Sequence, residues 1–185
     1  MMGIVSYGTY IPRYRLRVSE IAHSWHKEPD EVVASLGVVQ KAVPAADEDA
    51  VTLALEAAHN ALAVVDLKKE TIGVVLVGSE SHPYAVNPTS TIVAQMLGIG
   101  NSYLAADLEF ACKAATAGLQ LTAGLIESQR LDVGLIIGSD TAQSKPHDIL
   151  EYTAAAASAA YLMGSKQVIC ELVAFSSYSS DTPDF

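Results

Sequence analysis

The sequence predicts an α/β layered fold whose sheet is mainly parallel. Apolar runs of strand length alternate along the chain with stretches of helical periodicity, which is the order of elements in such folds. The runs TIGVVLV at 71–77 and LDVGLIIG at 131–138 are apolar throughout, which is typical of parallel strands covered on both faces. Half of the 185 residues are hydrophobic and 17% are charged, so the chain can build one domain with a real core.

Six segments are predicted to be strands. The first, GIVSYGTY, is broken off by Pro12, and the last two are separated by a Gly-Ser turn. The predicted strands are residues 3–10, 71–77, 103–110, 131–138, 154–162 and 168–175.

Five segments are predicted to be helices, namely residues 19–26, 30–37, 47–65, 88–98 and 113–129. The helix at 47–65 opens with three acids, which are favourable at a positive helix N-terminus, and then repeats apolar residues at helical spacing. The helix at 113–129 is small or apolar on nearly every face until its last turn. Because such a helix requires cover on all sides, we expect a partner layer beyond this chain's own elements.

Composition excludes several classes of protein. Eleven basic and 21 acidic residues give a formal charge of −10, so the chain has no general attraction for phosphate backbones and no nucleic acid is expected as a partner. No apolar run reaches about 18 residues, so no membrane span is expected. Two cysteines cannot form a disulfide framework, and MMGIVSYGTY lacks the build of a secretory signal. These features favour a reducing, cytoplasmic setting.

Cys112 is the first candidate for chemistry. It lies between the apparent strand AADLEF and the small-residue helix, where the helix dipole favours a thiolate and backbone N–H groups can bind an oxyanion. The alternative reading is a buried free cysteine that fills space, and spacing by itself favours that alternative. Cys170, inside a predicted strand, is the weaker of the two thiols as a candidate.

Glu80 is the second candidate, because it follows the strand TIGVVLV in the sequence VGSESHPY. Open α/β sheets place ligands at the carboxyl ends of parallel strands. His82 and Asp140 have a similar position. The alternatives are a surface-loop glutamate, a loop histidine before Pro83 and a turn aspartate, and these also remain open.

Other motifs are not supported. The remaining histidines have no Cys or His partner at metal-ligand spacing, so no zinc site is predicted; they are His23, His26, His59 and His147. The sequences GxGxxG, GxxxxGK[ST] and GxSxG do not occur. The arginines of YIPRYRLR (Arg13, Arg15 and Arg17) are interpreted as part of a solvated loop rather than an anion site.

Two segments carry a resemblance to a known family. EFACKAATAGLQ, with Cys112, resembles the nucleophile segment of 3-hydroxy-3-methylglutaryl-CoA synthases, and VGSES, with Glu80, resembles their general acid/base segment. The opening GIVSYGTYIPRYRL, the helix VPAADEDAVTLALEAAHNAL and the tail SSDTPDF are similar to the archaeal members. The two catalytic segments stand in the family's order and separation.

The resemblance implies a particular fold and division of the chain. The family fold is thiolase-like, with two similar α/β halves in five αβαβα layers, and this chain resembles the N-terminal half: a mainly parallel mixed sheet with helices on both faces. Residues 1–175 would be that half-domain, and residues 176–185 would begin the connection to a C-terminal half. The other half would supply a catalytic histidine and the missing cover for the Cys112 helix.

The resemblance also implies an activity, the condensation of acetyl-CoA with acetoacetyl-CoA in the mevalonate pathway of isoprenoid biosynthesis. Cys112 would be the acetylated nucleophile and Glu80 the general acid/base. No metal or redox cofactor is implied, because the coenzyme A thioesters are substrates. The implied partners are a second copy in a homodimer, an acetoacetyl-CoA thiolase and a small zinc-ribbon/OB-fold bridging protein.

Two other interpretations remain open. The chain could be a non-catalytic half-domain or subunit that needs a partner chain. It could also be a β-ketoacyl-ACP synthase-like condensing enzyme, since these share the cysteine; Glu80 argues against this, because they use His and Asn with Cys and lack the carboxylate.

Overall fold

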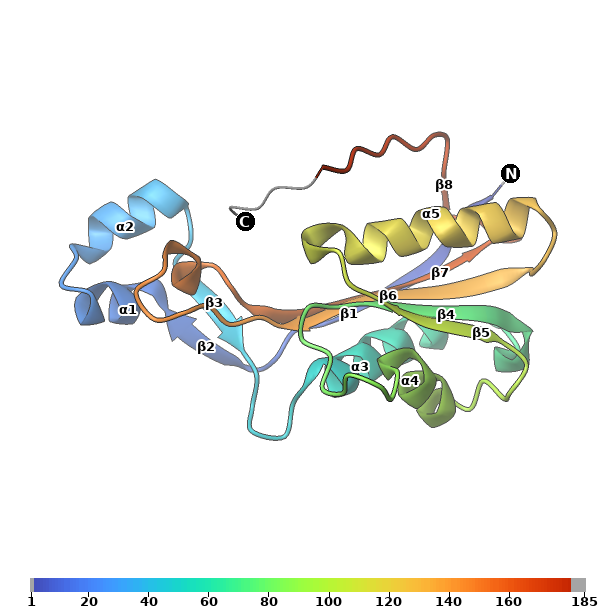
Figure 1. Ribbon diagram of the computed structural model, residues 1–185, viewed down its shortest axis with the longest axis horizontal. Coiled ribbons are helices and arrows are strands. Elements are labelled where there is room, and N and C mark those ends of the chain that lie inside the picture. The colour runs from blue at the N-terminus through green and yellow to red at the C-terminus, as the bar shows by residue number, and fades with distance from the viewer. Residues whose placement is uncertain (1, 181–185) are drawn as a thin grey trace.

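The computed structural model describes residues 2–180, which form a six-stranded mixed sheet with helices on both faces (Figure 1). The strand order is β5-β4-β6-β7-β1-β8. The strands are β1 (Gly3–Tyr10), β4 (Ile72–Gly78), β5 (Leu104–Leu108), β6 (Val133–Thr141), β7 (Ala156–Gly164) and β8 (Cys170–Glu171).

The sheet has a parallel and an antiparallel half. β4 pairs in parallel with both β5 and β6, whereas the pairs β6–β7, β7–β1 and β1–β8 are antiparallel. The mixed sheet is confirmed, but its predicted mainly parallel character holds for β5–β4–β6 alone. The reason is the connection from β6 to β7, which consists of loop and a short 3₁₀ turn, η3 (Ile149–Tyr152), instead of the crossover helix that a parallel return requires.

Three helices cover this sheet. α3 (Ala50–Ala63) and α4 (Thr89–Leu97) lie on one face, and α5 (Ala114–Glu127) lies on the other (Figure 1). α3 packs on β1, β6 and β7 through alanines that are fully buried, which brings its backbone close to the sheet. A Cβ atom at Gly8 of β1 would overlap the backbone nitrogen of Ala61, so this glycine permits the contact.

The start of α3 shows how the predicted acidic opening works. Asp49 is the N-cap, and its carboxylate accepts a hydrogen bond from Thr52 N–H at 2.8 Å while the Thr52 hydroxyl accepts one from Asp49 N–H at 2.8 Å. Beside it, Glu48 accepts a hydrogen bond from the Tyr10 hydroxyl at 2.6 Å, which joins the end of β1 to this helix start.

A second lobe lies at one end of the sheet (Figure 1). It contains β2 (Tyr14–Arg17), α1 (Val18–Ser24), α2 (Pro29–Leu36), β3 (Gln40–Val43) and η3. Its small core is formed by Val18, Ile21, Ala22 and Tyr152. Both helices were predicted. The antiparallel pair β2–β3 was not, because β2 is exposed except at Leu16 and so lacks the alternation that marks a strand.

Several predicted strand boundaries are wrong. The strand expected at 168–175 is reduced to Cys170–Glu171, which pairs with Gly3 and Ile4, and residues 172–180 form no further element. The strand expected at 154–162 lies at 156–164. The predicted connection at 176–185 extends past the described residues, since 181–185 lie outside them. Within residues 2–180 no helix has the length and apolarity needed to cross a membrane.

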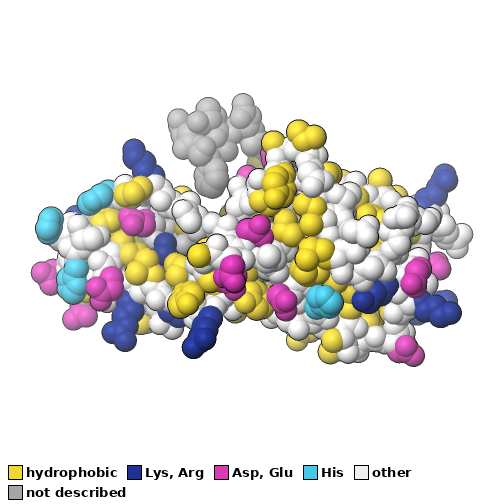
Figure 2. All heavy atoms as spheres, turned by 90° about the horizontal axis from the view of Figure 1, so that it is seen from below, with side chains coloured by type: hydrophobic (Ala, Val, Ile, Leu, Met, Phe, Trp, Pro, Cys, Tyr) yellow, Lys and Arg dark blue, Asp and Glu magenta, His cyan; other side chains and the backbone are white. Residues whose placement is uncertain are grey.

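Viewed from the face that carries α3 and α4, positive and negative side chains are interspersed (Figure 2). Lys and Arg do not gather there into one large patch.

Candidate active site

The candidate residues meet at one edge of the parallel half of the sheet. β4 leads into Glu80, β5 leads into Cys112, and β6 contains Asp140 near its end. Because β4 lies between β5 and β6 and runs parallel to both, these three strand ends are neighbours. They line a pocket of about 540 Å³ together with their loops; its lining residues are Glu80, Ser81, Ala111, Cys112, Asp140, Thr141, Ala142 and Gln143.

Cys112 lies in a 3₁₀ turn, η2 (Ala111–Lys113), directly before α5, and its thiol is exposed. Ala111 has φ +43°, a left-handed conformation that is costly for a residue with a Cβ. The turn is therefore held in place by its surroundings. Sequence reasoning placed Cys112 at a helix N-terminus but gave no sign of this strain.

Glycines on the sheet allow α5 to begin directly above the strand ends. A Cβ at Gly78 would overlap the backbone nitrogen of Ala115, and one at Gly138 would lie 3.0 Å from the Ala115 Cβ. The first turn of α5 is thus pressed against β4 and β6. The Lys113 and Ala114 N–H groups are used by the 3₁₀ turn, since they donate to Phe110 O and Ala111 O. The positive dipole end of α5 lies beside the Cys112 turn, where it favours a thiolate.

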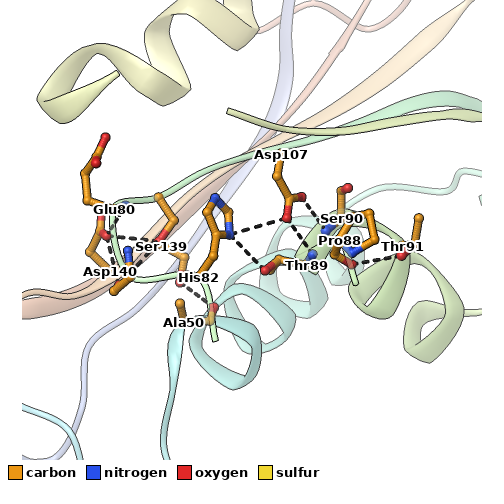
Figure 3. A network of polar contacts seen from close by, with 12 residues as sticks. Ala50, Glu80, His82, Pro88, Thr89, Ser90, Thr91, Asp107, Ser139 and Asp140 are labelled. Carbon is orange, nitrogen blue, oxygen red and sulfur yellow. Dashed lines mark hydrogen bonds and ion pairs between the residues drawn. The ribbon is translucent and has the colours of Figure 1, made fainter. Parts of the chain in front are cut away.

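Glu80 has an exposed side chain on a turn that Asp140 holds in place (Figure 3). Asp140 Oδ1 accepts hydrogen bonds from the Glu80 N–H at 2.8 Å and from the Ser79 and Ser81 hydroxyls, both at 3.0 Å. The Ser81 hydroxyl in turn accepts one from Thr141 N–H at 2.9 Å. The Glu80 side chain points away from these contacts. Asp140 is therefore the hub of this turn, meaning that its carboxylate accepts the hydrogen bonds that hold residues 79–81. The sequence favoured a simple turn residue at this position and did not indicate these bonds.

His82 is close to Glu80 in sequence but does not line the pocket. Its side chain is 7% exposed, and Nδ1 lies 2.9 Å from Thr89 Oγ1 and 3.4 Å from Asp107 Oδ2. It is thus not a pocket residue but a loop histidine before Pro83, as the second alternative had it, and its side chain is buried beside Asp107. Sequence reasoning missed Asp107 as its partner, because the two side chains meet only when the loop after β4 lies over the end of β5.

The other candidates lie elsewhere. Cys170 is exposed on β8, next to β1 at the antiparallel edge. In the second lobe, the His147 ring stacks on Trp25 with 5.2 Å between centroids. Arg15 and Arg17 lie on β2 at the start of the same lobe and Arg13 directly precedes it, so the predicted loop is in part a strand. Among residues 2–180, no group of three or more His, Cys, Asp or Glu side chains is placed to hold a metal ion.

Solved structures with this fold define its class. A β-ketoacyl-[acyl carrier protein] synthase III from Thermus thermophilus superposes with a TM-score of 0.81 at 19% identity, over 88% of this chain and 51% of that one. MvaS in complex with 3-hydroxy-3-methylglutaryl coenzyme A superposes with a TM-score of 0.84 at 26% identity, over 90% of this chain and 40% of that one. The chain therefore has a thiolase-like fold, with its candidate site at the edge where the parallel strands end.

Relatives found by sequence are more similar to this chain than these solved structures are. The chain is 56% identical over all 185 residues to the hydroxymethylglutaryl-CoA synthase of Methanocaldococcus jannaschii and 53% identical to that of Archaeoglobus fulgidus. The resemblance to hydroxymethylglutaryl-CoA synthases is thus confirmed along the whole chain. The chain spans about half of these relatives, 54% of each. No family model matches it.

Proposed function

We propose that the protein carrying this chain condenses acetyl-CoA with acetoacetyl-CoA to give 3-hydroxy-3-methylglutaryl-CoA. The observation that carries the proposal is the pocket in which Cys112 and Glu80 face a common space, in a chain that is 56% identical to a hydroxymethylglutaryl-CoA synthase. A solved neighbour bound to 3-hydroxy-3-methylglutaryl coenzyme A and another bound to CoA support acyl-CoA substrates.

The first step belongs to Cys112. Its thiolate attacks the thioester carbonyl of acetyl-CoA, the new C–S bond forms as the bond to coenzyme A breaks, and coenzyme A leaves as a thiol after taking up a proton. The start of α5 follows Cys112 directly, so its helix dipole favours the thiolate and the negative oxygen that develops on the acetyl group.

The second step belongs to Glu80. Its carboxylate removes a proton from the methyl group of acetyl-Cys112, and the resulting enolate attacks the ketone carbon of acetoacetyl-CoA. The alkoxide takes up a proton, and water then cleaves the enzyme thioester to release the product and the Cys112 thiol. The Asp140 contacts fix the turn that carries Glu80, so the carboxylate is delivered from a rigid backbone.

Further parts of the reaction lie beyond this chain. From the family resemblance we expect the remainder of the protein to supply the histidine that polarises the ketone and to cover α5, where Leu121 is 54% exposed. We also propose a cytoplasmic homodimer without a metal or redox cofactor, working beside a thiolase and a small bridging protein. A β-ketoacyl-ACP synthase-like activity is less well supported, because it offers no role for Glu80.

The experiment is mass spectrometry of the full-length protein after incubation with acetyl-CoA. We expect one added acetyl group, located on the peptide that contains Cys112, and formation of product once acetoacetyl-CoA is added. Cys112→Ser should abolish the modification. Cys170→Ser, the matched control at an exposed thiol outside the pocket, should leave it unchanged. Acetyl that persists in Cys112→Ser, or that is located on Cys170, would contradict the proposal.

A further inference from the structure

His82 connects the turn of Glu80 to the rest of the site from the side opposite Asp140. Its ring lies between the Glu80 turn and Asp107, with Nδ1 directed at Thr89 and Asp107 (Figure 3). The side chain is 7% exposed and that of Asp107 is 19% exposed, so solvent screens the pair weakly.

Asp107 is itself firmly placed. Its two carboxylate oxygens accept hydrogen bonds from the first N–H groups of α4, Oδ2 from Thr89 at 2.6 Å and Oδ1 from Ser90 at 2.8 Å. Asp107 thereby caps α4 from its position on β5, the strand that leads to Cys112. A side chain that contacts Asp107 is consequently anchored to the strand that precedes the nucleophile turn.

Burial of a histidine side chain at this position costs free energy. His82 Nε2 is buried and has no hydrogen-bond partner among the described residues, and such an atom costs about 1–3 kcal/mol. A phenylalanine ring would occupy the volume without that cost. The contacts of Nδ1 with Thr89 and Asp107 are therefore the feature that requires an imidazole.

We propose that His82 is a positioning residue for Glu80 in the proposed condensation. The turn 79–81 is held on the β6 side by Asp140, and His82 holds its continuation on the β5 side. Both neighbours of β4 thus hold the backbone from which the Glu80 side chain extends. His82 does not line the pocket and so acts through Glu80 rather than on the substrate. This inference rests on the proposed function.

Replacement of His82 should affect condensation, which uses Glu80, and leave acetylation of Cys112 unchanged. Loss of the Nδ1 contacts would let the Glu80 turn shift, and a displacement of about 1 Å at a catalytic group can cost about 10²-fold in rate. Cys112 is held by its own turn and by α5, so acetylation does not depend on His82. A residue with a merely structural role would slow both steps together.

The experiment compares His82→Phe and His82→Asn in the full-length protein, alone and combined with Glu80→Gln. Acetylation of Cys112 by acetyl-CoA and single-turnover condensation with acetoacetyl-CoA are measured separately. Asparagine is the conservative variant, because its amide nitrogen can take the place of Nδ1. His59→Phe is the matched control, since His59 is an exposed histidine on α3.

We expect His82→Phe to slow condensation at least 10-fold while acetylation stays within about 2-fold, and His82→Asn to recover part of the loss. In the Glu80→Gln background, His82→Phe should add no more than about 2-fold, because both changes remove the same function. Condensation within about 2-fold of wild type in His82→Phe, or an equal loss with and without Glu80, would overturn the inference. If His82→Phe does not fold, His82→Asn decides, since a loss confined to condensation supports the proposal and a loss shared by both steps overturns it. Full activity in Glu80→Gln would instead overturn the proposed function.

Discussion

The two halves of the sheet share a core and differ in what their strand ends carry. In β5–β4–β6 the strands are parallel, so three carboxyl ends meet at one edge and bring Glu80, Cys112 and Asp140 together. In β7–β1–β8 the strands are antiparallel, so the carboxyl ends of neighbouring strands lie at opposite ends of the sheet. Serines in or facing that half are engaged with main-chain carbonyls: the Ser6 hydroxyl donates to Ala61 O at 2.8 Å, and Ser158 donates to Gly138 O at 3.1 Å. Polar groups support the fold in the parallel half as well, where the Ser139 hydroxyl donates to Ala50 O at 2.7 Å, but the parallel strand ends also bring Glu80, Cys112 and Asp140 to one pocket.

The two cysteines make the same comparison at single-residue level. Both thiols are exposed, so exposure does not distinguish them. Cys112 follows a residue with φ +43° at the start of a helix and lines the pocket, whereas Cys170 lies on a short edge strand. Cys112 is the nucleophile candidate because it lies beside the carboxyl ends of the parallel strands.

The largest effect on stability and activity is expected from a methyl group added at the two glycines where a helix backbone contacts the parallel or the antiparallel half of the sheet. Gly78→Ala would force α5 away from β4, and Gly8→Ala would force α3 away from β1, because both Cβ atoms would overlap main chain. Each should lower the free energy of unfolding by about 1–3 kcal/mol or more, measured by urea titration. At a temperature where both variants remain folded, Gly78→Ala should lose acetylation of Cys112 more than 10-fold, and Gly8→Ala should retain it. Equal retention in both would contradict the comparison.

A smaller effect is expected from the hub of the Glu80 turn. Asp140→Ala removes the acceptor of three hydrogen bonds, two from hydroxyls and one from the Glu80 N–H. Hydrogen bonds to charged groups contribute about 1.5–3 kcal/mol each to stability, so their loss should loosen the turn that carries Glu80. Because a displacement of about 1 Å at a catalytic group can cost about 10²-fold in rate, condensation should fall at least about 10-fold. Ser158→Ala, which removes one bond in the antiparallel half, should lower stability by about 1 kcal/mol and leave turnover unchanged. Turnover that falls alike in both variants would show that the hub has no special part in the chemistry.

Much of this arrangement was predictable from local sequence. Continuous apolar runs indicated β4 and β6, and the acids before Ala50 indicated the start of α3. Cys112 and Glu80 were placed at strand ends, and parallel pairing explains why those ends share a pocket. These features follow from periodicity and capping, which act over a few residues.

Other features depend on contacts between distant segments. His82 meets Asp107 only after β4 and β5 have paired, and Asp140 accepts from a turn about sixty residues earlier in the chain. The positive φ of Ala111 has no marker in the sequence, since the residue at that position is not a glycine. The antiparallel return of β7 reflects a long connection without a helix, which the mainly apolar pattern of the strand did not reveal.

The smallest effect concerns a carboxylate outside the pocket. The Ala45 N–H and then the Tyr10 hydroxyl stabilise the charged form of Glu48, which lowers its pKa below the ordinary value of about 4.3. A lowered folded-state pKa adds stability that is present above that ordinary value and is lost as the pH falls through the folded-state pKa. Glu48→Gln should therefore lower the urea midpoint slightly at about pH 7, with a difference from wild type that shrinks in acid. Unchanged condensation in this variant is also expected, and a loss of turnover would contradict the separation of the two halves.

The division of labour between Cys112 and Glu80 is the central claim, and Glu80→Gln tests it most directly. The amide keeps the shape of glutamate but cannot accept the methyl proton, so acetyl-Cys112 should form within about 2-fold of the wild-type rate while condensation with acetoacetyl-CoA falls about 10²–10⁴-fold. Both steps are measured on the full-length protein, the first by mass spectrometry and the second by release of product. Condensation within about 2-fold of wild type would remove Glu80 from the mechanism and contradict the account.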